Sequence, residues 1–146
     1  MRPASIVLSA FLAAAGSGAS FGAEPAPPLA ARLAGHTLSA FAYVPPPPGA
    51  HAGNLARIML QAYLGPGGRA LVRSWDEARD AYTPVVERPW SLEGSNTLCV
   101  GMPGNAPSRV CADVHVWGPR IAGMGVQPYV QLDGDLKPGN MIGGRR

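Results

Sequence analysis

The clearest pattern in the chain is an alternation of apolar and polar residues in two runs, 97–102 and 109–117. Alternation with a period of two is typical of β-strands that bury one face. The stretch between them, 103–107, is rich in residues that favour turns. We therefore predict an antiparallel hairpin whose register places Cys99 opposite Cys111. In this register the aliphatic side chains share one face, and the two cysteines lie on the other.

These two cysteines, Cys99 and Cys111, are the only ones in the sequence. An even number of cysteines in an exported chain is typical of disulfide bonding, and closing this loop should stabilise the fold by about 3 kcal/mol. A zinc site usually needs four ligands at short paired spacings, and a thioredoxin-like site needs Cys-x-x-Cys. The spacing fits neither, so we predict a structural disulfide.

Further runs of β-type residues predict strands at 36–44, 69–75, 85–92 and 125–132, with Pro89 and Pro128 confined to an edge or a bulge. The segment 54–65 fits a helix that begins after Asn54, or a strand. We predict a strand, because the Gly-Pro-Gly-Gly that follows is typical of a hairpin turn. The polar stretch 76–83 is expected to be a loop or helical turn, and 133–135 a turn.

The composition agrees with many short elements, since the chain holds 19 glycines and 16 prolines. These residues interrupt helices and mark turns. We predict an all-β fold: a small antiparallel curved sheet or barrel of about six or seven short strands with one disulfide hairpin. The domain is expected to span 36–136. A Pro/Ala-rich leader with a short helical turn, 24–35, precedes it, and a tail, 137–146, follows it.

Residues 1–23 have the layout of a secretory signal peptide: Arg2, an uncharged run, then small residues. We predict cleavage between 19 and 23. The apolar run falls short of the roughly 20 residues that a transmembrane helix needs, so no membrane span is expected after cleavage. The mature protein is therefore expected to be periplasmic or extracellular.

The charge of the chain argues against nucleic acid as a partner. The formal net charge is only +3, and the basic residues are scattered along the sequence rather than clustered. A nucleic-acid binder usually shows a concentrated basic patch. We expect an unknown ligand or an envelope protein as the partner.

No catalytic residues, metal ligands or cofactors are predicted. Beyond the predicted signal peptide the chain has no Gly-x-Ser-x-Gly motif, and its three histidines lack metal-binding spacings. His115 and Asp113 share one strand face, but two ligands make a poor metal site. Trp90, Trp117 and Arg120, with these two residues, form the candidate binding surface, because an exposed tryptophan can stack on a sugar or a partner. The alternative is that the tryptophans pack in the core.

Several short motifs carry a resemblance to a known group. They are Leu33-Ala34-Gly35-His36-Thr37-Leu38, Trp90, Leu98-Cys99 followed by Cys111, and Lys137-Pro138-Gly139-Asn140. In these the chain resembles a loose group of small, mostly uncharacterised exported bacterial domains. The resemblance implies a compact antiparallel β structure with one disulfide, and it implies no activity.

Three hypotheses for the function follow from the sequence. The first is an exported non-enzymatic module that binds a small ligand, a glycan or a protein. The second is a small secreted hydrolase that uses carboxylates or a site at His115. The third is a structural protein of the cell envelope.

Overall fold

The computed structural model describes residues 27–44, 56–103, 108–126 and 129–143. The predicted signal peptide and Pro128 lie outside these residues. The described part holds one short α-helix, one 3-10 turn and nine strands. They are α1 (Leu29–Leu33), β1 (His36–Val44), β2 (Ala56–Leu64), η1 (Pro66–Gly68), β3 (Arg69–Asp76), β4 (Ala81–Tyr82), β5 (Val86–Glu93), β6 (Thr97–Gly101), β7 (Arg109–Trp117), β8 (Arg120–Val126) and β9 (Tyr129–Pro138).

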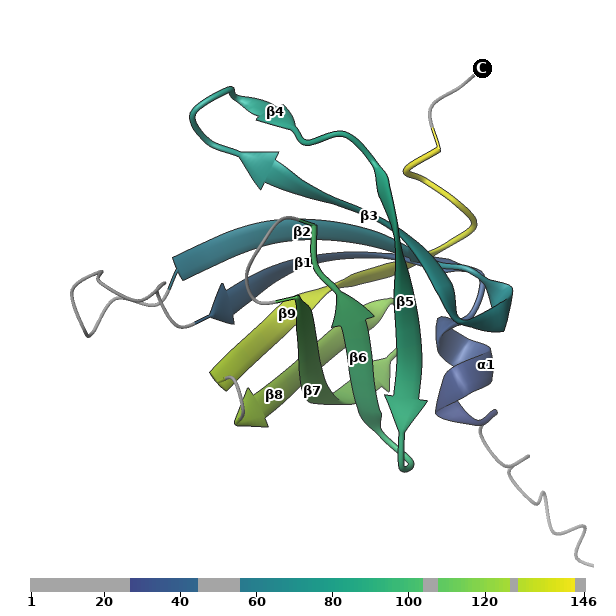
Figure 1. Ribbon diagram of the computed structural model, residues 1–146. Coiled ribbons are helices and arrows are strands. Elements are labelled where there is room, and N and C mark those ends of the chain that lie inside the picture. Colours follow the sequence, from purple (N-terminus) through teal and green to yellow (C-terminus); the bar gives the residue numbers. More distant parts are fainter. Residues whose placement is uncertain (1–26, 45–55, 104–107, 127–128, 144–146) are drawn as a thin grey trace, which may run out of the picture.

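Eight strands form a closed antiparallel barrel (Figure 1). Apart from β4, each strand pairs with the next one along the chain, and β9 returns to pair with β1. Within the described residues β4 pairs with β3 alone, and the two form a hairpin that projects beyond the barrel wall. The all-β prediction is confirmed, with more strands than expected because the segment 76–83 contains β4 and the last predicted strand is in fact two.

The disulfide hairpin has the predicted register. Cys99 lies opposite Cys111, with their Cα atoms 4.1 Å apart, and the two are disulfide-bonded. The bond lies on the outer side of the barrel wall, where Arg109 Nε approaches Cys111 Sγ to 3.2 Å. The predicted strand in 54–65 is also confirmed as β2, and its side chains Leu60, Ala62 and Leu64 point inward and are buried.

The end of the chain differs from the prediction. The expected single strand 125–132 contains the end of β8 and the start of β9, and the expected turn at 133–135 lies inside β9. Position 134 requires a glycine, because Ser39 and Ala40 of β1 lie so close to its inner side that a β-carbon would overlap them. The glycine thus allows a close approach of two strands, as often happens at barrel bends, and does not mark a turn.

The C-terminal residues beyond β9 pack on the barrel instead of extending away from it. The Thr37 hydroxyl donates to the Gly139 carbonyl oxygen at 2.7 Å and accepts from the Met141 N–H at 2.9 Å. Ile142 is 2% exposed. The stretch expected to be a tail from 137 onward is therefore part of the folded unit as far as Gly143.

The barrel interior is filled by its own side chains. Many inward positions hold alanine or glycine, which lets the strands come close together, and larger apolar residues, mostly aliphatic, occupy the rest. A small cavity among the described core residues has a volume of about 20 Å³, room for no more than a single water molecule. The short helical turn predicted in 24–35 is present as α1, and it covers one barrel end rather than forming a separate leader: Leu33 is fully buried, and Arg32 donates to the Val116 carbonyl oxygen at 2.8 Å.

Candidate binding face

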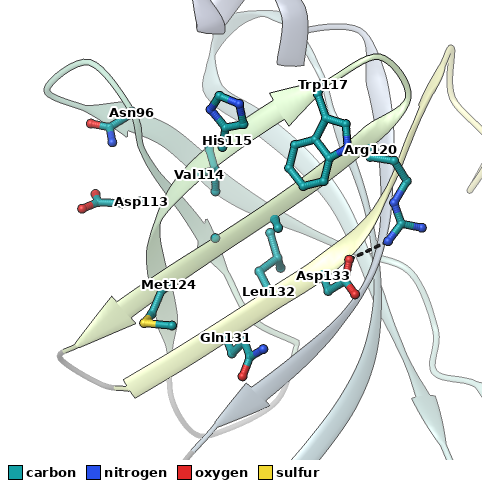
Figure 2. Close-up of a pocket in the computed structure, with 12 residues that line it drawn as sticks. Asn96, Asp113, Val114, His115, Trp117, Arg120, Met124, Gln131, Leu132 and Asp133 are labelled. Carbon is teal, nitrogen blue, oxygen red and sulfur yellow. Dashed lines mark hydrogen bonds and ion pairs between the residues drawn. The ribbon is translucent and has the colours of Figure 1, made fainter.

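With its interior filled, the described barrel offers space for a ligand mainly on its outer surface. An open groove of about 690 Å³ lies over β7, β8 and β9 (Figure 2). The alternation along each strand supplies its side chains, because residues that point away from the core line the groove. Polar and aromatic side chains in its lining could contact a ligand, and they include Asp113, His115, Trp117, Arg120, Gln131 and Asp133.

An aromatic pair stands at one end of this outer groove. The rings of His115 and Trp117 are stacked, with centroids 5.6 Å apart and planes inclined by 29° (Figure 2). Two positions apart on β7, the residues project from the same face. Trp117 is 46% exposed, so a large part of its indole ring is open to a ligand. An indole held in one orientation offers a flat apolar surface that loses little conformational entropy on binding.

Arg120 links β8 to β9 at the side of the groove next to Trp117 (Figure 2). Its guanidinium contacts Asp133 at 2.7 Å and Asp135 at 3.2 Å. These side chains are about half exposed, so the pairs contribute little to stability. These ion pairs instead fix the positions of the groups: they hold two carboxylates and a guanidinium beside Trp117. Trp117 lies directly opposite Arg120 in the strand register.

The other carboxylate of the groove is also held by a neighbour. Asp113 Oδ1 accepts a hydrogen bond from the Thr97 hydroxyl across the β6–β7 ladder. The carboxylates are thus fixed as hydrogen-bond acceptors, and the amide of Gln131 adds both a donor and an acceptor nearby. Such a set of groups suits a ligand with several hydroxyls.

A second hollow lies beside the first, between the barrel wall and the β3–β4 hairpin. This hairpin cleft has a volume of about 290 Å³. Phe41 and Met59 line it from β1 and β2, and Tyr82 lines it from β4. Arg120 and Asp133 line both hollows, so the cleft continues the groove.

The structure brings together four of the five residues predicted as a binding surface: Asp113, His115, Trp117 and Arg120 all line the groove. Trp90 does not, because it is 9% exposed and packs in the core, where its indole N–H donates to the Gly65 carbonyl oxygen at 2.8 Å.

Sequence reasoning missed the contribution of β9 and of the hairpin. Asp133 and Asp135 were assigned to a turn, although their period-two spacing is the signal of two side chains on one strand face. Tyr82 and Phe41 are far apart in the sequence and meet only through the topology. The sequence offered no sign of the cleft that they line.

The described residues contain one group of three side chains close enough to share a metal ion: Glu93, Cys99 and Cys111. Both sulfur atoms are joined in the disulfide, so they offer no thiolate ligands. His115 and Asp113, considered above as a ligand pair, are not part of that group.

Comparison with protein-family models, curated proteins and solved structures finds no match to this chain. The resemblance to small exported domains therefore stays a prediction. In the described residues, α1 is far too short to cross a membrane, and no other helix has the length and apolar character to do so.

Proposed function

We propose that this protein is an exported, non-enzymatic module that binds a neutral carbohydrate in the outer groove over β7, β8 and β9. The observation that carries the proposal is the half-exposed indole of Trp117, stacked on His115 and bordered by fixed carboxylates. A pyranose ring has an apolar face of C–H groups that can stack on an indole, and hydroxyls around its rim that can bond to carboxylates and amides.

The export part of the proposal rests on two features. Residues 1–23 have the layout of a signal peptide, and the Cys99–Cys111 disulfide is compatible with an oxidising compartment. The filled interior further supports an external site, because a lipid or another apolar ligand would need far more space than the 20 Å³ cavity.

The same groove offers less support for a hydrolase. Glycoside hydrolysis generally uses two carboxyl groups, one of which donates a proton. In the groove Asp133 is paired with Arg120, and Asp113 accepts from Thr97, so each is arranged as an acceptor. His115 stacks on Trp117, and its ring has no nucleophilic side chain among the described groove residues.

The proposal is tested by calorimetric titration with N-acetylglucosamine oligomers and with glucose oligomers, both β-1,4-linked. We expect Trp117→Ala to weaken binding about tenfold or more, which corresponds to about 1.4 kcal/mol, because the stacking surface is lost. Trp117→Phe should retain part of the affinity. The matched control is Arg69→Ala, which removes an exposed side chain on β3 that pairs with Glu87 outside both hollows. Equal affinity of Trp117→Ala and the wild type, or no binding of either sugar series, would overturn the proposal.

A further inference from the structure

A continuous row of outward side chains crosses six neighbouring strands. Residues directly opposite each other in antiparallel strands lie side by side on the same face. From β7 to β3 the opposed residues are Trp117, Arg120, Asp135, Ser39, Gln61 and Arg73. We call this set the polar row. At a strand spacing of about 4.8 Å it is roughly 24 Å long, which is much longer than a single sugar ring.

The polar row is fixed by its own hydrogen bonds. Gln61 Nε2 donates to Ser39 Oγ at 3.3 Å, and Arg73 Nε donates to Gln61 Oε1 at 2.8 Å. At the other end Arg120 contacts Asp135 at 3.2 Å. Hydroxyl, amide and guanidinium groups have donors or acceptors beyond one bond each, so a ligand can bind to groups that are already oriented.

The hairpin supplies an aromatic cover at the far end of the row. The Arg73 guanidinium lies 4.2 Å from the centroid of the Tyr82 ring, and Tyr82 contacts Trp75 edge to face at 5.1 Å. Below Tyr82, Phe41 and Met59 form the apolar floor of the hairpin cleft. A ring that enters the cleft would therefore have apolar surfaces on two sides and the polar row along its edge.

The charges of this face point to a neutral ligand. The two hollows are lined by one arginine and three aspartates, and two further arginines lie beside them on β2 and β3: Arg120, Asp113, Asp133 and Asp135, with Arg57 and Arg73. The arginines are engaged as well, since Arg120 pairs with aspartates and the Arg57 guanidinium lies 3.8 Å from the centroid of the Phe41 ring. A polyanion would meet no excess positive potential here.

We infer that the ligand is a linear neutral oligosaccharide that lies across the strands along the polar row, with one end on Trp117 and the other in the hairpin cleft under Tyr82. This inference rests on the proposed function and adds to it the length and direction of the ligand. Two subsites joined by one chain bind more tightly than either alone, because the second contact is intramolecular.

The test measures affinity against chain length, with β-1,4-linked N-acetylglucosamine oligomers from the disaccharide to the hexasaccharide. The wild type should bind the hexasaccharide about tenfold or more tightly than the disaccharide. In Tyr82→Ala this ratio should fall towards one, and in the control Arg69→Ala it should stay at the wild-type value. Equal affinity for both lengths in the wild type would overturn the inference while leaving the proposed function standing. No binding of any oligomer would overturn both.

A second measurement does not depend on how well Tyr82→Ala folds. Hydrogen exchange in the wild-type hairpin, residues 74–83, should slow when the hexasaccharide is bound and should not change with a saturating amount of the disaccharide. Equal protection of the hairpin by both sugars would contradict the inferred position of the oligosaccharide along the polar row. So would the absence of protection when both sugars are bound.

Discussion

Gly134 lies on the inner side of β9, where a β-carbon would overlap the Ser39 carbonyl oxygen and crowd Ala40. The neighbouring strands approach so closely here because small residues occupy several inward positions. At Gly123 and Gly125 a β-carbon would likewise overlap atoms of β7. These glycines narrow the barrel, and the narrow barrel leaves no room inside for a ligand.

Replacing Gly134 by alanine should therefore destabilise the protein by about 3 kcal/mol, because the strands must separate to admit one methyl group. The matched control is Gly67→Ala in η1. Gly67 has a φ of 78° and open space around it, so this change should cost only about 1 kcal/mol of backbone strain. Urea unfolding of both variants measures the difference. A Gly134→Ala protein as stable as the wild type would show that the strands are not packed as described.

At the scale of elements, the C-terminal segment after β9 is held on the barrel by one buried hydroxyl and by a hydrogen bond from the Gly139 N–H to the Gly35 carbonyl oxygen at 2.8 Å. Thr37 is 1% exposed and bonds to both Gly139 and Met141. Ile142 is buried beside this contact. The segment thus covers the start of β1, at the barrel end that α1 also covers.

Thr37→Val keeps the shape of this side chain and removes its hydrogen bonds. It should destabilise the fold by about 1 to 3 kcal/mol, because two partly buried hydrogen bonds are lost, one to the Gly139 carbonyl oxygen and one from the Met141 N–H. Hydrogen exchange at 139–143 should accelerate more than at β6 and β7. Thr37→Ser, which keeps the hydroxyl, is the control. If hydrogen exchange accelerated equally in all strands of the barrel, Thr37 would not be a local anchor of the C-terminal segment.

The elements differ in how well the sequence predicts them, and the difference is physical. The disulfide hairpin was predicted in register because its two strands are close in sequence and a covalent bond fixes one pair. The β8–β9 region was misassigned because Gly134 has a packing role that depends on a distant strand. The hairpin cleft could not be foreseen, since its walls meet only when the barrel closes.

For the candidate site the same reasoning holds. Asp113, His115 and Trp117 are on one strand, so their common face follows from alternation alone. Arg120 joins them across a tight β7–β8 connection. Asp133 can be assigned to the groove only when β9 is known to continue through the expected turn. Trp90 points into the core rather than to the surface, because its direction is set by the pairing of β5 with β6.

At the scale of the whole molecule, a closed barrel with a filled interior carries its proposed binding groups on the outside. The closure removes the free edges along most of the sheet, and the disulfide and the C-terminal segment reinforce the wall. The outer groove and the hairpin cleft share Arg120 and Asp133, and together their lining residues come mostly from five neighbouring strands of the barrel, β7, β8, β9, β1 and β2. In the proposed function the barrel is a scaffold for an external binding face, in contrast to barrels that hold a ligand inside.

The most direct test of this claim is an NMR titration of the wild-type protein with the β-1,4-linked N-acetylglucosamine hexasaccharide. We predict that the signals of the Trp117 indole N–H and the Met124 methyl group, both on exposed side chains, shift with the sugar. The methyl signals of Leu98, Val100 and Val110, which line the small interior cavity, should stay in place. Shifts of the interior methyl groups with an unchanged Trp117 signal would show that the ligand enters the barrel and would contradict the account.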